Sequence, residues 1–302
     1  IKVSGLQKKA VDTDTLAFYL APRINAAGRM DHADLAFTLL TTDNPAAADQ
    51  VARELHLLNT ERQRTENIIL KEIQGHIADR PQLLDRQSLI LAQPGWHAGI
   101  LGIVAARVAK QFHRPVVLIA LDGETGQGSG RSIPGLDLYT ALNACQHTLL
   151  GFGGHTMAAG LKIQTDHLPD FQEAFEATIQ SMSADASLAP EITIDCELDF
   201  KDIDDTLIDT IESMQPFGTA CPKPSFMTHD VRVRSSKMVG TVHRRMVLSQ
   251  STGQDNVRFD AIQFNADQDK ALAEHFKRIS FEIQWNRWNG ICKPQLVITA
   301  AE

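Results

Sequence analysis

The sequence lacks several features that would identify a class of protein at once. Its four cysteines lie far apart and form no C-x-x-C pair, so sequence neighbours cannot build a zinc knuckle or a redox motif. No uninterrupted apolar run of about 18 residues occurs, and the N-terminus lacks the charged-then-apolar pattern of a secretion signal. We therefore expect a cytoplasmic protein, outside the membrane, with free and buried thiols.

The sequence also has fewer basic residues than acidic ones. The chain has 29 Lys and Arg against 37 Asp and Glu, a formal net charge of -8. This balance argues against nucleic-acid binding through overall charge, but it permits a local basic groove, because phosphates respond to nearby Arg and Lys. The chain begins at Ile1, in mid-pattern, so we expect it to be a fragment of a longer protein.

Apolar periodicity divides the chain into parts. Residues 1–45 form the first part, which is mixed over 1–30 and then has Asp31 as the expected N-cap of a short amphipathic helix. Residues 46–82 repeat apolar positions at helical spacing and predict one long connecting helix. Residues 83–183 alternate strand and helix patterns, which predicts an α/β domain with a mixed sheet, and a linker follows at 183–190. Residues 190–302 contain a helix at 203–214 and then short period-two runs, which predict a small β-barrel or sandwich.

Glycine surrounds a histidine at Gly153-Gly154-His155. Without a Cβ the backbone can approach a ligand closely, and consecutive glycine amides can form a concave donor surface for an anion. His155 would add a directed N–H donor, or a positive charge when protonated. The alternative is a glycine turn with a histidine satisfied in the core.

Two further clusters combine small residues with polar side chains. Gly128 to Ser132 holds two hydroxyls and the guanidinium of Arg131, which can grip phosphate oxygens in bidentate fashion, although Gly/Ser loops are common. His97 lies at a predicted strand-to-helix junction, just before a helix predicted at 99–112, and helix N-termini are favoured anion positions. The alternative there is a turn with a helix cap.

Together these clusters resemble the DHHA1 domain of the DHH phosphoesterase superfamily, and most closely that of the RecJ single-strand-specific DNA exonucleases. The matching segments are 97–102, 128–132 and 153–160. Upstream, residues 21–30 look like the RecJ junction with the catalytic domain, and 215–218 and 239–243 look like its oligonucleotide-binding (OB) barrel. Residues 219–222 depart from the family's Asn-Pro-like turn, so contacts of that loop are not carried over.

The resemblance implies a metal that this chain does not bind. The family's catalytic domain holds two divalent ions, normally Mn²⁺, with Mg²⁺ as the other candidate, through Asp/His motifs that this sequence does not contain. Asp31-His-Ala-Asp34 is rejected as such a motif because it opens an amphipathic helix without partner carboxylates. We expect the chain alone to be inactive and to need no cofactor.

The resemblance also implies roles for residues. Ser129, Arg131 and Ser132 would bind a terminal 5′ phosphate, and Gly153, Gly154 and His155 would face the backbone near the scissile bond. His97, Arg23 and Arg29 would border the same cleft. In the barrel, basic residues beside aromatic ones are typical of single-strand binding: Arg232, Arg234, Lys237, His243, Arg244 and Arg245, with Phe226, Trp285 and Trp288 as stacking faces. Core tryptophans and solvated charges are the alternative there.

These expectations converge on the substrate-positioning part of a metal-dependent 5′ to 3′ single-stranded DNA exonuclease of DNA repair and recombination. A single-strand-binding protein is a further candidate partner. One alternative is a non-catalytic nucleic-acid-binding relative. Another is a small-nucleotide phosphoesterase, which the long helix and added barrel disfavour. An alanyl-tRNA synthetase accessory domain is disfavoured by the segment at 21–29.

Overall fold

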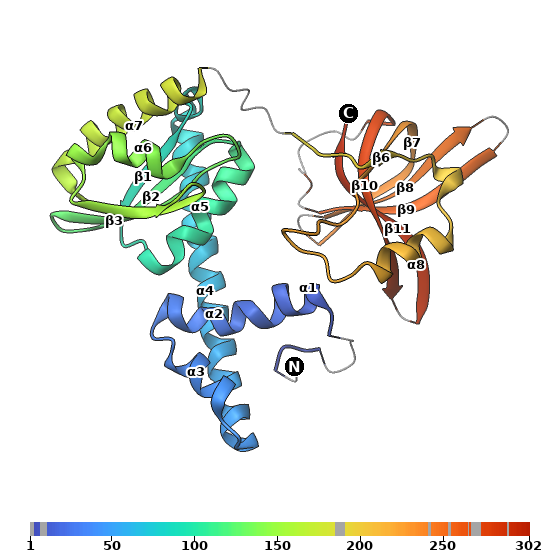
Figure 1. The fold of residues 1–302 in the computed structure, drawn as a ribbon, viewed down its shortest axis with the longest axis horizontal. Helices are drawn as coiled ribbons and strands as arrows, with labels where there is room; N and C mark the ends of the chain where they lie inside the picture. The colour runs from blue at the N-terminus through green and yellow to red at the C-terminus, as the bar shows by residue number, and fades with distance from the viewer. Residues whose placement is uncertain are drawn as a thin grey trace. The chain divides into compact units, whose positions relative to one another are not determined.

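The computed structural model describes residues 3–6, 11–184, 191–240, 243–252, 255–264, 266, 273–288 and 290–302. Contacts between residues divide the chain into two compact units, 1–190 and 191–302 (Figure 1). Among the described residues, no helix is both long and apolar enough to cross a membrane.

The first unit opens with short helices and one long helix. The helices α1 (Thr13–Thr15), η1 (Leu16–Leu20, π-helical) and α2 (Ala21–Met30) run on from one another, and α3 (Asp34–Thr41) and α4 (Pro45–Asp79) follow. Asn44 caps α4, because its side-chain oxygen accepts the N–H groups of Ala46 and Ala47. The N-cap predicted at Asp31 is wrong: the N–H of Asp31 donates to the Ala27 carbonyl, so this residue ends α2.

The 35 residues of α4 confirm the long helix expected from the periodicity. Near its start, Val51 and Leu55 pack against Ala27 of α2 and Ala36 of α3. Near its end, Ile73 and its apolar neighbours join the core beneath the following sheet. One apolar stripe of α4 therefore packs against both the N-terminal helices and the sheet.

The sheet of the first unit is mixed, as predicted. Its strands lie in the order β1-β2-β3-β5-β4, with β1 and β2 parallel and the other pairs antiparallel. Helices α4 and α5 cover one face, and α6 and α7 cover the other (Figure 1). The elements are β1 (Leu89–Pro94), α5 (Ala98–Phe112), β2 (Val116–Asp122), β3 (Thr125–Arg131), α6 (Leu138–Ala144), β4 (Gly151–His155), β5 (Ala158–Gln164) and α7 (Leu168–Ser183), with short 3-10 turns η2 (Pro81–Asp85), η3 (Gln146–Thr148) and η4 (Thr165–His167).

One local prediction needs correction in this unit. The residue pattern predicts a helix over 137–150, but the helix ends at Ala144 and the 3-10 turn η3 follows it. The Gly153-Gly154-His155 segment belongs to the strand β4, pairs with β5 and leaves His155 exposed, so the alternative of a glycine turn with a buried histidine does not hold. Backbone pairing with β5 makes a strand of glycines that have no strand propensity of their own.

The second unit is a closed β-barrel, which confirms the predicted OB-like module. Strands β7, β8, β9, β11 and β10 follow one another around it, and β10 pairs with β7 to close it. Phe200, Phe281 and Leu296 lie in its core. The elements are β6 (Cys196–Glu197), η5 (Phe200–Asp202), α8 (Asp205–Ser213), β7 (Phe226–Val239), β8 (His243–Thr252), β9 (Asp255–Gln263), β10 (His275–Trp288) and β11 (Ile291–Ala301).

The cysteines are free but mostly not buried. Only Cys145 is buried, whereas Cys196, Cys221 and Cys292 are exposed, so the expectation of buried thiols is wrong for these three. Burial raises the pKa of the Cys145 thiol, against a smaller opposite effect of its hydrogen bond with Thr178.

Two glycines of the mixed sheet, on β3 and β4, should respond differently to the same substitution. A Cβ at Gly128 would lie 2.8 Å from Leu161 Cδ1, whereas a Cβ at Gly153 meets nothing within 4 Å. We expect Gly128→Ala to lower the free energy of unfolding by about 1–3 kcal/mol through overpacking, and Gly153→Ala to leave it unchanged or raise it slightly. Urea denaturation of both variants tests this, and equal destabilisation would contradict it.

Candidate nucleic-acid interface

One face of the sheet brings two predicted site residues into register. Arg131 at the end of β3 pairs with Ala158 of β5, and Ala158 pairs in turn with His155 at the end of β4. Directly paired residues project to the same face of a sheet, and neighbouring strands lie about 4.8 Å apart. Arg131 and His155 therefore stand on one face, with Ala158 between them and a backbone separation of about 10 Å.

Beyond helix α5, glycines make up much of this face of the sheet. Ser129 pairs with Gly160, which pairs with Gly153, and Gly151 follows opposite Lys162. These glycines are exposed, and a Cβ at any of them would meet nothing closer than 3.8 Å. Packing does not require glycine at these three positions, and its presence leaves the backbone open to a ligand.

Arg131 lies half-buried where β3 meets α5. Its guanidinium donates to the Gly130 carbonyl (2.7 Å) and to Ser129 Oγ (3.2 Å). It also occupies the space above Gly102 of α5, where a Cβ would lie 2.5 Å from Arg131 Nη2. Burial, and then the positive charge of Arg29, lower the pKa of Arg131, but an arginine remains charged in proteins. Arg131 is thus a positive charge that no carboxylate among the described residues neutralises.

His155 stands at the tip of the hairpin formed by β4 and β5. Its side chain is exposed and makes no hydrogen bond or ion pair within the described residues. Backbone hydrogen bonds fix the turn after it: Ser132 N–H donates to the Met157 carbonyl and Leu138 N–H to the Thr156 carbonyl. The histidine is therefore held by its backbone while its ring stays available.

Ser132 and Gly154 do not join this face. The hydroxyl of Ser132 is buried and donates to the Leu136 carbonyl, so it shapes the loop after β3. Gly154 is required by the fold, because a Cβ there would lie 2.4 Å from the Ala158 carbonyl oxygen. The structure gives these two residues a role in the fold, and their expected contact with a ligand stays a prediction.

His97 is the residue before α5, and its ring points into the protein. Its Nδ1 is buried and has no hydrogen-bond partner among the described residues. The first turn of α5 abuts α2, since a Cβ at Gly99 would lie 2.1 Å from the Arg29 carbonyl oxygen. The absence of a side chain at Gly99 allows this close approach of the two backbones, and His97 borders the junction between α2 and α5.

The two arginines of α2 point to different places. Arg29 lies near Arg131 and Arg62, because its charge acts on the pKa of both. Arg23 instead donates to the Tyr19 carbonyl (2.6 Å) and to Nδ1 of His56 on α4 (3.2 Å). Arg29 therefore belongs with the cationic site, whereas Arg23 is used in the packing of α2 against α4.

A buried carboxylate that sequence reasoning missed organises this region. Glu66 of α4 is 1 % exposed; its Oε2 accepts from Arg62 Nη1 (2.8 Å), and its Oε1 lies 2.9 Å from Arg107 Nε of α5. Burial chiefly lowers the pKa of Arg62, with Glu66 opposing this and Arg107 and Arg29 reinforcing it. The signal in the sequence was polar and charged residues at positions of the apolar stripe, since Asn59, Arg62 and Glu66 are all buried on α4.

The barrel carries most of its predicted basic residues on one outer surface. Arg232 pairs with Ser249, Lys237 with Arg245, and Val239 with His243, all on the outward-facing positions of β8. Arg234, at the bulge in β7, donates to Ser249 Oγ (2.7 Å), and Arg245 contacts Asp260 (3.0 Å). Arg258 of β9 also pairs with Ser249 and extends this surface, although it was not predicted.

Some barrel predictions are not met by the structure. Arg244 is only 8 % exposed and sits at an inward-facing position of β8, so it does not lie on the outer surface. Phe226 is buried in the core and cannot stack on a base. Trp285 packs against the core, and its indole N–H donates to Asp209 of α8 (2.8 Å). The side chain of Trp288 lies outside the described residues.

No metal site is formed by the part of the chain that the structure describes. Within it, no three His, Cys, Asp or Glu side chains come together in a way that could hold an ion. His32, in the segment rejected above, is exposed beside Asp31 (3.7 Å). These residues do not fit the ligand set that the resemblance implies for the catalytic domain.

Family comparisons divide the chain in the same way. A model of the DHHA1 domain matches residues 85–181, and a model of the RecJ OB domain matches residues 194–300. The first match covers the mixed sheet with its candidate interface, and the second covers the barrel.

Relatives match over the full chain. The single-stranded-DNA-specific exonuclease RecJ of Bacillus subtilis is 31 % identical over 307 residues, which is all of this chain and 38 % of that protein. The RecJ of Haemophilus influenzae is 32 % identical over 314 residues, again all of this chain and 54 % of that protein. The chain thus spans about half or less of the length of these relatives.

Solved structures agree. RecJ of Thermus thermophilus in complex with Mn²⁺ superposes with a TM-score of 0.80 and 25 % identity, covering all of this chain and 43 % of that one. The same protein in complex with Mg²⁺ gives a TM-score of 0.78.

Replacing the buried carboxylate should destabilise the first unit strongly. Glu66→Gln leaves Arg62 buried beside Arg107 and Arg29 without a counter-charge, so we expect the free energy of unfolding to fall by about 3–5 kcal/mol. A matched control is Arg53→Gln, which breaks an exposed i,i+4 pair with Asp49 on the same helix and should cost less than about 0.5 kcal/mol. Chemical denaturation measures both, and similar small losses would contradict the role given to Glu66.

Proposed function

We infer that this chain, which belongs to the RecJ family and corresponds to the C-terminal part of its members, is the portion of a single-stranded DNA exonuclease that binds and positions the strand. The observation that carries this proposal is the row of exposed glycines beside the Arg131–Ala158–His155 row, on the part of the sheet face that lies beyond α5. The parent protein would digest DNA from the 5′ end in repair and recombination.

The chemistry of this face suits a sugar-phosphate backbone. A flat surface of glycine lets phosphate and sugar come close to main-chain atoms. Arg131, supported by Ser129, supplies a planar fork that can grip two oxygens of a terminal phosphate. His155, about 10 Å away on the same face, would reach a following phosphate, since successive phosphates on a strand are several ångströms apart.

Arg29 adds to this preference for an anion. Its charge lowers the pKa of Arg131, which means that the two cations repel one another in the free protein. An incoming phosphate dianion would relieve that repulsion. Binding energy is then available to fix the end of the strand, which is what a positioning domain must do.

The barrel would hold the strand farther from its end. Its outer surface carries Arg232 and Lys237 on β7 and Arg258 on β9, the two strands that flank β8, where they can follow a phosphate backbone. With Phe226 and Trp285 engaged in packing, we propose that contact here is mainly electrostatic rather than by base stacking.

Hydrolysis would need groups that this part of the protein does not supply. The Thermus thermophilus relatives carry Mg²⁺ or Mn²⁺, whereas the described residues of this chain offer no ligand set for such an ion. We therefore propose that the chain alone binds single-stranded DNA without cleaving it. We propose a single-strand-binding protein as a partner, because such proteins coat single-stranded DNA. We also propose a cytoplasmic location.

Binding of the phosphorylated end provides the direct test. We expect Arg131→Gln to weaken binding of a 5′-phosphorylated single-stranded oligonucleotide about tenfold, because hydrogen bonds to charged groups contribute about 1.5–3 kcal/mol. The same variant should bind the 5′-hydroxyl oligonucleotide almost as the parent chain does. Fluorescence anisotropy with 3′-labelled oligonucleotides measures both affinities.

The control for this experiment is Lys110→Gln, an exposed cation on α5 away from the sheet face. It should not discriminate between the two oligonucleotides. Equal losses for both oligonucleotides in Arg131→Gln would show that the arginine acts on structure or on the strand in general, and the assignment of the 5′ phosphate would be wrong.

Salt dependence tests the barrel surface. Each phosphate contact contributes roughly 0.7 to the slope of log Kd against log salt for single strands, so Lys237→Gln should reduce that slope by about this amount. Arg287→Gln is the matched control, because Arg287 is held by two hydrogen bonds to Glu212. Titrations between low and moderate salt give the slopes, and an unchanged slope for Lys237→Gln would remove the barrel from the binding surface.

A further inference from the structure

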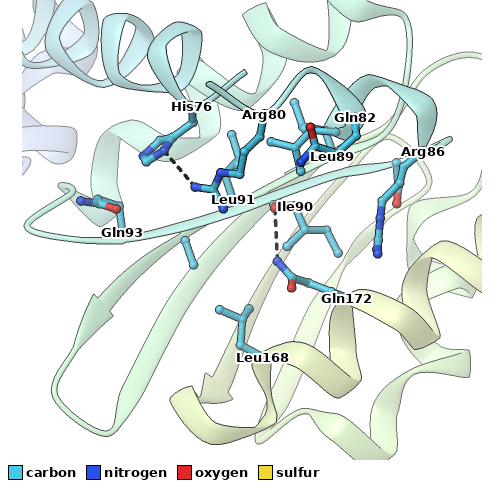
Figure 2. Close-up of a pocket in the computed structure, with 13 residues that line it drawn as sticks. His76, Arg80, Gln82, Arg86, Leu89, Ile90, Leu91, Gln93, Leu168 and Gln172 are labelled. Atoms are coloured by element: carbon cyan, nitrogen blue, oxygen red, sulfur yellow. Dashed lines mark hydrogen bonds between the residues drawn. The ribbon is translucent and has the colours of Figure 1, made fainter. Parts of the chain in front are cut away.

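Strand β1 is an edge of the mixed sheet, and a groove of about 390 Å³ runs along it. Figure 2 shows the groove between the end of α4 with the following turn on one side and α7 on the other. The groove lies at the opposite edge of the sheet from β4, so it is separate from the candidate nucleic-acid interface.

The main chain of β1 is left partly unpaired in this groove. Leu89 N–H donates to the Pro115 carbonyl, which places the odd-numbered residues of β1 in hydrogen bonds with β2. The even-numbered residues then direct their N–H and C=O groups into the groove. The Ile90 carbonyl accepts a long bond from Gln172 Nε2 (3.4 Å), whereas Ile90 N–H and both groups of Ala92 have no partner among the described residues.

The groove walls carry positive charge and no carboxylate. Arg80 is exposed, and its guanidinium contacts only the ring of His76 (3.2 Å) in the described part of the chain. Arg86 lies at the other end and is paired with Glu173, outside the groove lining. This is a local cationic rim on a chain whose formal charge is -8.

The remaining lining combines aliphatic side chains with amides. Leu83 and Leu168 supply apolar surface, and Gln82, Gln93 and Gln172 supply groups that can donate and accept. No Phe, Tyr or Trp is among the lining residues, so the groove offers no ring for base stacking. Apolar spots, amides and unpaired strand groups together match a polypeptide better than a nucleic acid.

We propose that the β1 edge is a docking site for an extended, acidic peptide segment of a partner protein. The peptide adds a strand to the sheet through the main-chain groups of Ile90 and Ala92, as in strand addition to other sheet edges. Alternate apolar side chains of the peptide contact Leu83 and Leu168, and its carboxylates face Arg80, which has no carboxylate partner among the described residues, whereas Arg86 is already paired with Glu173. The rim sets the charge preference, and the strand edge supplies the hydrogen bonds.

The test is selection from a display library of random twelve-residue peptides against the chain, followed by affinity measurements on the enriched peptides. We expect enrichment of acidic peptides rich in β-branched residues. Ala92→Pro removes the outward N–H while leaving the hydrogen bonds to β2, and should weaken these peptides about tenfold, the equivalent of one main-chain hydrogen bond. The control Ala92→Ser retains the N–H and should bind like the parent chain.

Charge reversal distinguishes the contribution of the cationic rim from that of the main-chain groups of β1. Arg80→Glu should weaken the selected peptides about fivefold, as expected for a rim ion pair, whereas Lys110→Glu on α5 should have no effect. Three outcomes would overturn the proposal: no enrichment, enriched peptides without acidic bias, or binding that Ala92→Pro leaves unchanged. Displacement of the peptides by single-stranded DNA, with equal loss of DNA binding in Arg80→Glu, would reassign the groove to nucleic acid.

Discussion

The in-register pairing of β3, β5 and β4 is the constraint on which the candidate interface depends. Because side chains alternate between faces with a period of two, the pairing of Arg131 and His155 with Ala158 fixes all three on one face. The alternate positions, Ala159, Leu161 and Ile163, are buried against α6 and α7. A shift of one residue would move the glycines into the core and the apolar residues into solvent, so the core enforces the geometry of the open face.

Charge is organised by a second constraint, the burial of Glu66. An isolated buried carboxylate is costly, and an isolated cluster of arginines is costly too. Glu66 forms ion pairs with Arg62 of α4 and Arg107 of α5, which offsets the cost of burying both kinds of charge. Arg29 and Arg131 lie close by and have no carboxylate partner among the described residues. An acidic chain can in this way maintain a local excess of positive charge where a phosphate is expected.

Much of this arrangement was predictable from the sequence, and the failures share a cause. Apolar periodicity predicted α4, the α/β domain and the barrel, because the residues of a buried stripe or face recur at a fixed spacing in the sequence. It missed that Gly153 lies in a strand, because pairing with β5 and not intrinsic propensity decides this. It also misplaced Arg244 and Phe226, since the bulge in β7 and the closure of the barrel determine which positions point inward.

Glycines of the mixed sheet show how structure distinguishes fold from function where sequence cannot. Gly126, Gly128 and Gly130 lie on the face of β3 toward α6 and α7, where a Cβ would press on Ile119, Leu161 or Leu138. Gly151, Gly153 and Gly160 lie on the opposite face, where a Cβ would meet only open space or ordinary contact. The first set is explained by packing. The second set has no such explanation within the chain, and a ligand that must approach the backbone closely is the physical reason that remains.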